Sequence, residues 1–202
     1  EEQKAAAIEE GKRESDAFVA WLQENFPGFE NAKIASYPTE LYVRETRHIN
    51  ALYRVTIADV WESTDKYDTI AYGSYPVDVQ AMEKGNFGNV ITEANQYAIP
   101  YRSILPLEVD NLMVASKASG YDSLAAGSAR IIPTGMSVAE AAGVIANYAI
   151  DNDKALKDLV GDKEFIKAIQ KTLKDQGAYL KPLGNYKFPY EDDPIYPSLK
   201  IL

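Results

Sequence analysis

The sequence predicts an α+β fold in which a mixed β-sheet region is flanked by helices. Near the N-terminus, Phe18, Trp21 and Leu22 share one face at helical spacing, and apolar residues recur at the same period from 138 to 150. Between these ends, residues 41–46 and 52–56 alternate apolar with polar side chains, which is typical of strands with one buried face.

The first helix is predicted over residues 1–26, because Pro27 and Gly28 end its pattern. Local patterns in the middle of the chain predict further elements: a helical turn at 57–61, a strand at 68–75, a turn-rich loop at 85–89, and an extended segment at 97–105 broken by Pro100.

Residues 110–143 predict a strand at 112–115, a loop of small residues, and a helix that follows Pro133, Thr134 and Gly135. The first turn of a helix has unpaired backbone N–H groups and the positive end of the helix dipole, so it suits an anion or a polarised carbonyl oxygen. The alternative is an ordinary strand–helix packing unit without a ligand.

A last helix is predicted after Asp162, with Phe165, Ile166, Ile169 and Leu173 inward and Gly177 as its stop. The proline-rich tail from Lys181 predicts a linker or a strap over the surface. We therefore divide the chain into an N-terminal helix, a β region, a strand–helix region, a helical segment and a tail, at residues 1–28, 29–109, 110–150, 151–180 and 181–202.

Charge and composition exclude several functions. The 202 residues carry a net charge of -9, which disfavours binding to nucleic acid or to an anionic membrane surface. The absence of cysteine and the single histidine disfavour a metal site. No apolar run is long enough to span a bilayer, and we expect no membrane span.

The densest charge cluster contains Arg44, Glu45, Arg47 and His48. On a strand, Arg44 and His48 would face the same side. Two guanidiniums near an imidazole suit a carboxylate-bearing small molecule, which arginine would clamp while histidine moves a proton. The alternative is an exposed polar strand with routine surface ion pairs.

Two other arginines are candidates. Arg102, beside Tyr101 in an apolar segment, needs either a ligand or a structural salt bridge. Arg130 lies just before the helix that could meet an anion, where it would either reinforce that site or pack over the helix start.

Taken in order, several stretches resemble the C-terminal half of a family of FAD-dependent oxidoreductases, which are two-domain flavoproteins. The matching stretches are YVRETRHINALYRVTIADV at 42–60, DTIAYGSYPVDV at 68–79, YAIPYRSILP at 97–106 and DNLMVASKASGYDSLAAGSARIIPTGMSVAEAAG at 110–143.

The resemblance implies that 112–115 is the last strand of a Rossmann-type FAD domain, and that residues 40–106 form much of the substrate domain. It implies pocket roles for Arg44, Arg47, His48, Tyr101 and Arg102. It also implies flavin contacts, which would come from Ser116, Lys117, Arg130, Thr134, Gly135, Met136 and Ser137.

The sequence also departs from the family pattern. Ser116-Lys117 stands where Gly-Arg is usual, Ala139-Glu140 replaces Gly-Gln, and His48 replaces a second arginine. Ala51 and Gln80 replace a glycine and a histidine. No G-x-G-x-x-G occurs, so the element that holds the FAD pyrophosphate is missing.

We therefore expect a C-terminal fragment of an FAD-dependent oxidoreductase that is inactive alone and binds FAD weakly or not at all. Its expected partners are an anionic small-molecule substrate and the missing N-terminal FAD-binding half. The alternative is a non-redox binding or structural module with a basic pocket.

Overall fold

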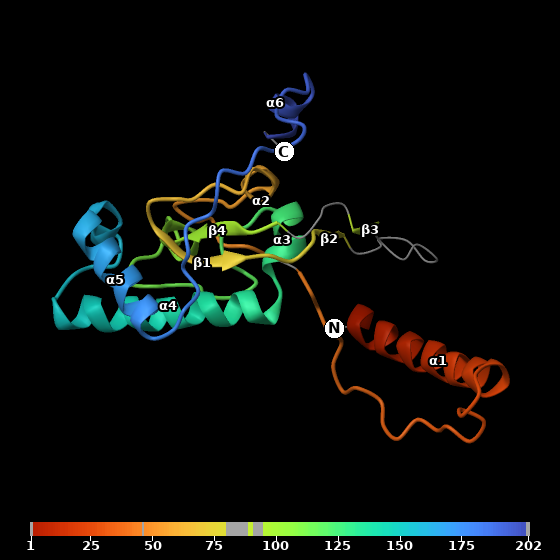
Figure 1. The fold of residues 1–202 in the computed structure, drawn as a ribbon. Coiled ribbons are helices and arrows are strands. Elements are labelled where there is room, and N and C mark those ends of the chain that lie inside the picture. Colours follow the sequence, from red (N-terminus) through yellow and green to blue (C-terminus); the bar gives the residue numbers. More distant parts are fainter. Residues whose placement is uncertain (1, 46, 80–88, 91–94, 201–202) are drawn as a thin grey trace. The chain divides into compact units, whose positions relative to one another are not determined.

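The computed structural model of the chain describes residues 2–45, 47–79, 89–90 and 95–200. The chain forms two compact units, Glu1–Arg44 and Glu45–Leu202 (Figure 1).

The first unit consists of α1 (Glu2–Asn25) and an extended return segment, and the helix predicted over 1–26 is confirmed. The Tyr37 hydroxyl donates a hydrogen bond to Asp16, and Lys4 pairs with Glu40, so the return segment is tied to α1. Residues 41–45 form no strand, contrary to the prediction for 41–46. A strand requires a neighbour that completes its hydrogen-bond ladder, and no strand in the described part of this unit provides one.

The second unit is built around two buried antiparallel strands, β1 (Thr69–Gly73) and β4 (Tyr97–Pro100). The pairing of Gly73 with Tyr97 lays the Tyr97 ring over the glycine, where a Cβ would come within 2.3 Å of the ring. A second ladder joins β2 (Asp78–Val79) to β3 (Asn89–Val90). Strands combined with long helices confirm the α+β class.

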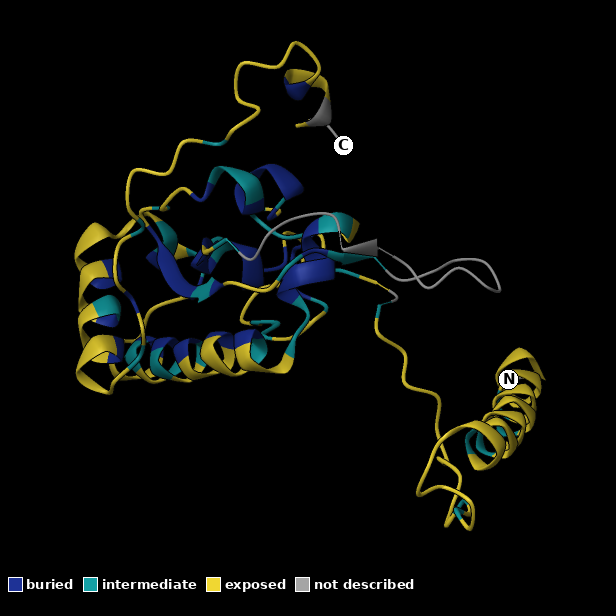
Figure 2. Ribbon diagram, turned by 45° about the vertical axis from the view of Figure 1, so that its right-hand side comes forward, coloured by how far each residue is buried: buried dark blue, intermediate teal, exposed yellow. Residues whose placement is uncertain are grey.

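Helices cover β1 and β4 on both faces (Figure 1). On one side α4 packs against β1 and α5, while on the other α2 contacts β4 and α3. Figure 2 shows the buried residues gathered where these layers meet. The helix bounds are α2 (Ile57–Glu62), η1 (Tyr101–Ile104), α3 (Ser123–Ala129), α4 (Ile132–Asp151), η2 (Asp158–Gly161), α5 (Lys163–Asp175) and α6 (Tyr196–Leu199).

The two long C-terminal helices follow their predicted patterns. Val138, Ala141 and Ile145 form the buried face of α4, which begins at Ile132, earlier than the predicted period. Asp162 caps α5 by accepting hydrogen bonds from the N–H groups of Glu164 and Phe165, as the sequence predicts.

Three predicted segments in the second unit have a different structure. Residues 52–56 and 112–115 do not form strands. The first segment has an isolated bridge at Val55, next to another at Ala51. In the second, the Val114 N–H donates to Ile104 O at 2.8 Å. Short segments without a continuous neighbour make single hydrogen bonds rather than a ladder. The segment at 97–105 is extended only as far as Pro100, after which Tyr101–Ile104 form the 3-10 helix η1. The loop predicted at 85–89 lies outside the described residues except for Asn89.

One carboxylate caps two helices at once. Asp122, the N-cap of α3, accepts from Ala125 N at 2.6 Å and from Ile57 N, the first residue of α2, at 3.0 Å. We expect Asp122→Ala to lower the free energy of unfolding by about 2 kcal/mol or more, because two buried donors lose their acceptor. Asp162→Ala is the control, since it removes the cap of α5 alone and should cost about 1 kcal/mol. Equal losses in urea unfolding would contradict the double cap.

Candidate functional site

The stretches that contain residues 47–56, 101–106 and 114–123 meet around Gly120 in the second unit. The Val55 N–H donates to Gly120 O at 2.8 Å, and the Gly120 N–H donates to Ser103 O at 2.8 Å. A Cβ at Gly120 would lie 2.4 Å from Ala51 Cβ and 2.8 Å from Tyr53 O. This close approach requires glycine, and it brings together three motifs that are distant in the sequence.

His48 lies at the edge of this junction, 86 % of its side chain buried. Its Nε2 is 3.0 Å from Glu45 Oε1, and its Nδ1 is 3.1 Å from Ser119 O. Both ring nitrogens therefore face oxygen atoms of the protein, one from a side chain and one from the backbone. Glu45 Oε1 also accepts a hydrogen bond from Ser123 Oγ at 2.8 Å, so the carboxylate joins His48 to the first turn of α3.

Tyr121 packs beside His48, with ring centroids 6.3 Å apart. Burial raises the pKa of Tyr121 to about 12, although a hydrogen bond with Ser119 acts in the opposite direction. The phenol therefore keeps its proton at neutral pH. The sequence patterns did not identify Tyr121 as a site residue. The feature that would have identified it is its place between the small-residue loop and Asp122, which caps α3.

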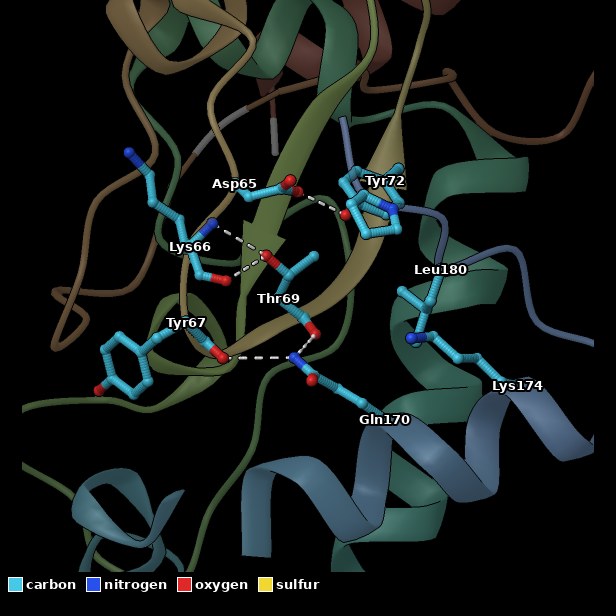
Figure 3. A pocket seen from close by; sticks show the side chains of 9 residues that line it. Asp65, Lys66, Tyr67, Thr69, Tyr72, Gln170, Lys174 and Leu180 are labelled. Atoms are coloured by element: carbon cyan, nitrogen blue, oxygen red, sulfur yellow. Dashed lines mark hydrogen bonds between the residues drawn. The ribbon is translucent and has the colours of Figure 1, made fainter. Parts of the chain in front are cut away.

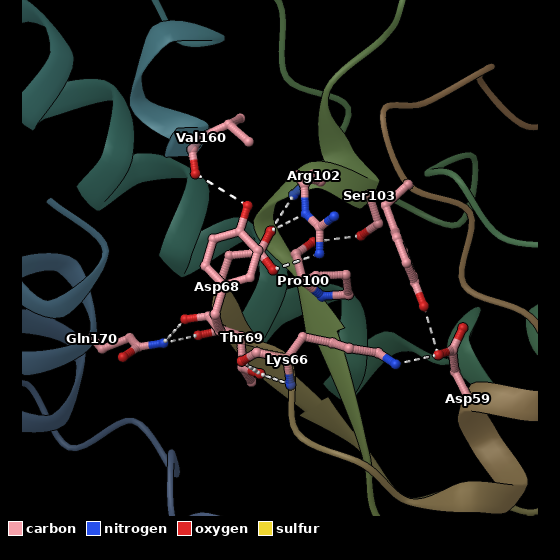
Figure 4. Close-up of polar contacts among 11 residues, drawn as sticks. Asp59, Lys66, Asp68, Thr69, Pro100, Arg102, Ser103, Val160 and Gln170 are labelled. Atoms are coloured by element: carbon pink, nitrogen blue, oxygen red, sulfur yellow. Dashed lines mark hydrogen bonds and ion pairs between the residues drawn. The ribbon is translucent and has the colours of Figure 1, made fainter. Parts of the chain in front are cut away.

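Arg102 is held by a buried carboxylate (Figure 4). Asp68, which is fully buried, accepts from Arg102 Nε at 2.9 Å, from Nη2 at 3.1 Å and from the backbone N–H at 3.1 Å. The guanidinium also lies 4.9 Å from the Tyr53 ring centroid and 4.8 Å from that of Tyr67. The structural salt bridge that the sequence left open is therefore present, and the hydrogen bonds to Asp68 raise the pKa of Arg102 further.

A second polar network joins Tyr53, Asp59 and Lys66. Asp59 Oδ1 accepts from the Tyr53 hydroxyl at 2.7 Å and pairs with Lys66 Nζ at 2.7 Å (Figure 4). Burial, followed by the hydrogen bond to Asp59, raises the pKa of Tyr53 to about 12. The sequence patterns do not indicate this network, because its three residues come from separate segments of the chain.

The remaining substrate-side candidates differ in exposure. Tyr101 is fully buried and donates to Leu156 O at 2.8 Å, and burial raises its pKa. Arg47 is exposed. Arg44 belongs to the first unit, where it lies 5.1 Å from the Tyr42 ring centroid. The strand that would place Arg44 and His48 on one face is absent from the described residues, and Thr46 lies outside them.

The candidates around α4 are mostly accessible. The N-cap of α4, Ile131, provides no side-chain cap, and Met136 is 68 % exposed. A Cβ at Gly135 would touch nothing within 4 Å. Thr134 is buried, and Ser137 Oγ donates back to Pro133 O.

The other predicted flavin contacts lie in separate surroundings. Ser116 and Lys117 are exposed in a loop. Arg130 is largely buried, and it donates to Asp78 O at 3.1 Å and lies 3.4 Å from Asp78 Oδ2, so it bridges α3 and β2.

A family model described as FAD dependent oxidoreductase matches residues 3–173. The chain belongs to this family. No curated protein and no solved structure matches it. The match includes α1 and ends within α5.

The N-terminal end of α4 has three features that would suit a flavin ring. The N-terminus of α4 is not capped by a side chain, Ile132 and Met136 expose apolar surface, and space is open above Gly135. A planar ring with an electron-rich edge suits this combination. The sequence has no G-x-G-x-x-G loop for a pyrophosphate, so the fit covers only the ring end of FAD.

Two further features concern the described residues alone. No group of three His, Asp or Glu side chains there has the arrangement of a metal site. None of the helices in the described ranges combines the length and apolarity that crossing a membrane requires.

Proposed function

We propose that this chain contributes the substrate-side residues and the flavin-facing end of α4 to an FAD-dependent oxidoreductase. We further propose that the dinucleotide-binding loop lies outside these 202 residues. The observation that carries the proposal is the junction around Gly120, where His48, Ser103 and Tyr121 meet although their motifs are far apart in the sequence. Such convergence is expected when separate motifs serve one site.

In this proposal, bound FAD supplies the acceptor or donor of a hydride. His48, oriented by Glu45 and Ser119, would hold or move a proton at Nε2. The protonated phenol of Tyr121 would keep the adjacent surface neutral. Arg47, which is exposed, would attract an anionic small-molecule substrate.

The alternative is a non-redox module with a basic pocket for an anion. The pairing of Arg102 with Asp68 weakens this alternative, because it neutralises one of the arginines that such a pocket would use. The first turn of α4 has no charged residue, so the edge of a flavin ring can approach its backbone directly. This favours the redox proposal.

The first test is FAD binding by the purified chain. We expect flavin absorbance far below the protein concentration, because the pyrophosphate has no dinucleotide loop to bind. A polypeptide that extends this chain to include such a loop should bind FAD at one equivalent. Equimolar flavin in the 202-residue chain would overturn the proposed division of the site.

The role of α4 is tested by its effect on the flavin potential. In the FAD-loaded polypeptide, Met136→Glu should lower the midpoint potential, because a negative charge near the ring disfavours the anionic reduced flavin. Ile150→Glu is the control, since Ile150 is equally accessible but lies at the far end of the same helix. Equal shifts for the two variants, or no shift for Met136→Glu, would exclude a flavin at this helix end.

A further inference from the structure

We propose that the second unit has a separate binding site for a neutral, hydroxyl-rich small molecule such as a monosaccharide or a cyclic polyol. The site is a pocket of about 340 Å³ between the end of α2, the segment before β4 and the C-terminal tail. Its volume lies at the lower end of the range for small-molecule sites. Its polar side chains come from Ser63, Asn95, Gln96, Asn185 and Tyr186.

Ser63 carries a hydroxyl without a partner at the C-terminal end of α2. Its side-chain oxygen is buried without a hydrogen-bond partner, while the residue as a whole is 7 % exposed. Its backbone has φ 49° and ψ 46°, the left-handed conformation of a helix C-cap, which fixes Ser63 at the end of α2. A buried hydroxyl without a partner is costly, and a ligand hydroxyl in the pocket that Ser63 lines could provide the partner.

The other polar groups of the pocket are carboxamides with unused hydrogen-bonding capacity. Asn95 Nδ2 donates to the Tyr186 hydroxyl at 3.0 Å, which leaves its carbonyl oxygen and a second N–H. The side chains of Gln96 and Asn185 make no hydrogen bond with any residue that the structure describes. A carboxamide both donates and accepts, as sugar hydroxyls do, so these groups match a ligand with several hydroxyls.

The pocket has no charged side chain among its described lining residues, which favours a neutral ligand over an ion. A neighbouring pocket of about 210 Å³ differs in this respect, since Asp65, Lys66 and Lys174 line it (Figure 3). Figure 3 shows Lys174 reaching from α5 toward Tyr72 and Leu180. The two pockets therefore select different ligand chemistry, although the tail contributes to both.

The tail is fixed well enough to form a pocket wall. The Leu183 N–H donates to Asp65 Oδ2 at 2.9 Å, and Phe188 stacks on Trp61 with ring centroids 5.6 Å apart. Tyr196 donates to Glu62 Oε1 at 3.1 Å. The tail lies beyond residues 3–173, so one wall of this site is outside the part of the chain that the family model covers.

The test uses the 202-residue chain, labelled with ¹⁵N, and follows the side-chain carboxamide signals during titration. The probes are glucose, galactose and myo-inositol, with glucuronate as the charged comparison. We expect at least one neutral probe to shift the Asn95, Gln96 and Asn185 signals with a dissociation constant of about 1–10 mM. Glucuronate should bind at least about threefold more weakly, since an unpaired carboxylate pays for its desolvation.

Variants connect the binding to the pocket. Asn185→Asp should weaken binding of the neutral probe by about fivefold, because it introduces a charge into the pocket. Asn147→Asp, at an exposed position of α4, should leave binding unchanged. Ser63→Ala should weaken binding without lowering the melting temperature, since the hydroxyl has no partner to lose.

Three results would overturn the proposal. They are the absence of saturable shifts for every neutral probe up to about 50 mM, equal binding of glucuronate, and unchanged binding by both pocket variants. None of these measurements involves FAD, so failure here leaves the proposed redox function unaffected.

Discussion

Asp68→Ala is expected to lower the free energy of unfolding by about 3 kcal/mol, as is typical when one partner of a buried ion pair is removed. The Asp68 carboxylate accepts three hydrogen bonds from Arg102, and its backbone carbonyl accepts one from the Tyr101 N–H at 2.8 Å. The variant leaves the guanidinium without its acceptor between the rings of Tyr53 and Tyr67, where 23 % of the Arg102 side chain is exposed. Urea unfolding measures the loss.

Asp110→Ala provides the control for this prediction. Asp110 pairs with Lys157 at 2.6 Å, but its side chain is 89 % exposed. Solvent screening limits such a pair to less than about 1 kcal/mol. If Asp68→Ala cost no more than Asp110→Ala, Arg102 would be free to bind a substrate carboxylate instead, and the basic-pocket alternative would regain support.

Periodicity and caps were sufficient to predict the long helices. The apolar face of α4 and the Asp162 cap of α5 are local features, so the sequence alone specifies them. Strand predictions were confirmed only where the structure provides a partner, as for β1 with β4. Residues 41–45 and 112–115 have strand-like composition, but pairing is a non-local property that their composition does not encode.

The candidate site shows the same limit. The charge cluster predicted that Arg44 and His48 would face one pocket, whereas the structure pairs His48 with Glu45, which is close in sequence. Its second partner, Ser119, and the ring of Tyr121 come from a segment about 70 residues away, so only the fold brings them to His48. Arg102 was recognised as a charge in need of a partner, while the identity of that partner, Asp68, required the pairing of β1 with β4.

Gly120→Ala is expected to be strongly destabilising, because the added methyl group would overlap atoms from two neighbouring segments. The added Cβ would lie 2.4 Å from Ala51 Cβ, 2.8 Å from Tyr53 O and 3.0 Å from Ser103 O. Two of these atoms are backbone oxygens, which cannot move without breaking the hydrogen bonds that join the three segments. Overpacking of this kind typically costs about 1–3 kcal/mol, and the backbone contacts place this variant at or above the upper limit.

Gly143→Ala is the matched control for steric crowding. Gly143 lies in the exposed part of α4, and a Cβ there would meet nothing within 4 Å. Alanine should therefore stabilise the helix by about 0.5–1 kcal/mol, opposite in sign to the effect at Gly120. Because the Gly120 junction also positions His48 and Tyr121, Gly120→Ala should reduce turnover in the FAD-loaded polypeptide while Gly143→Ala should not. If the Gly120→Ala chain were stable and its turnover unchanged, the Gly120 junction would not be part of the proposed active site.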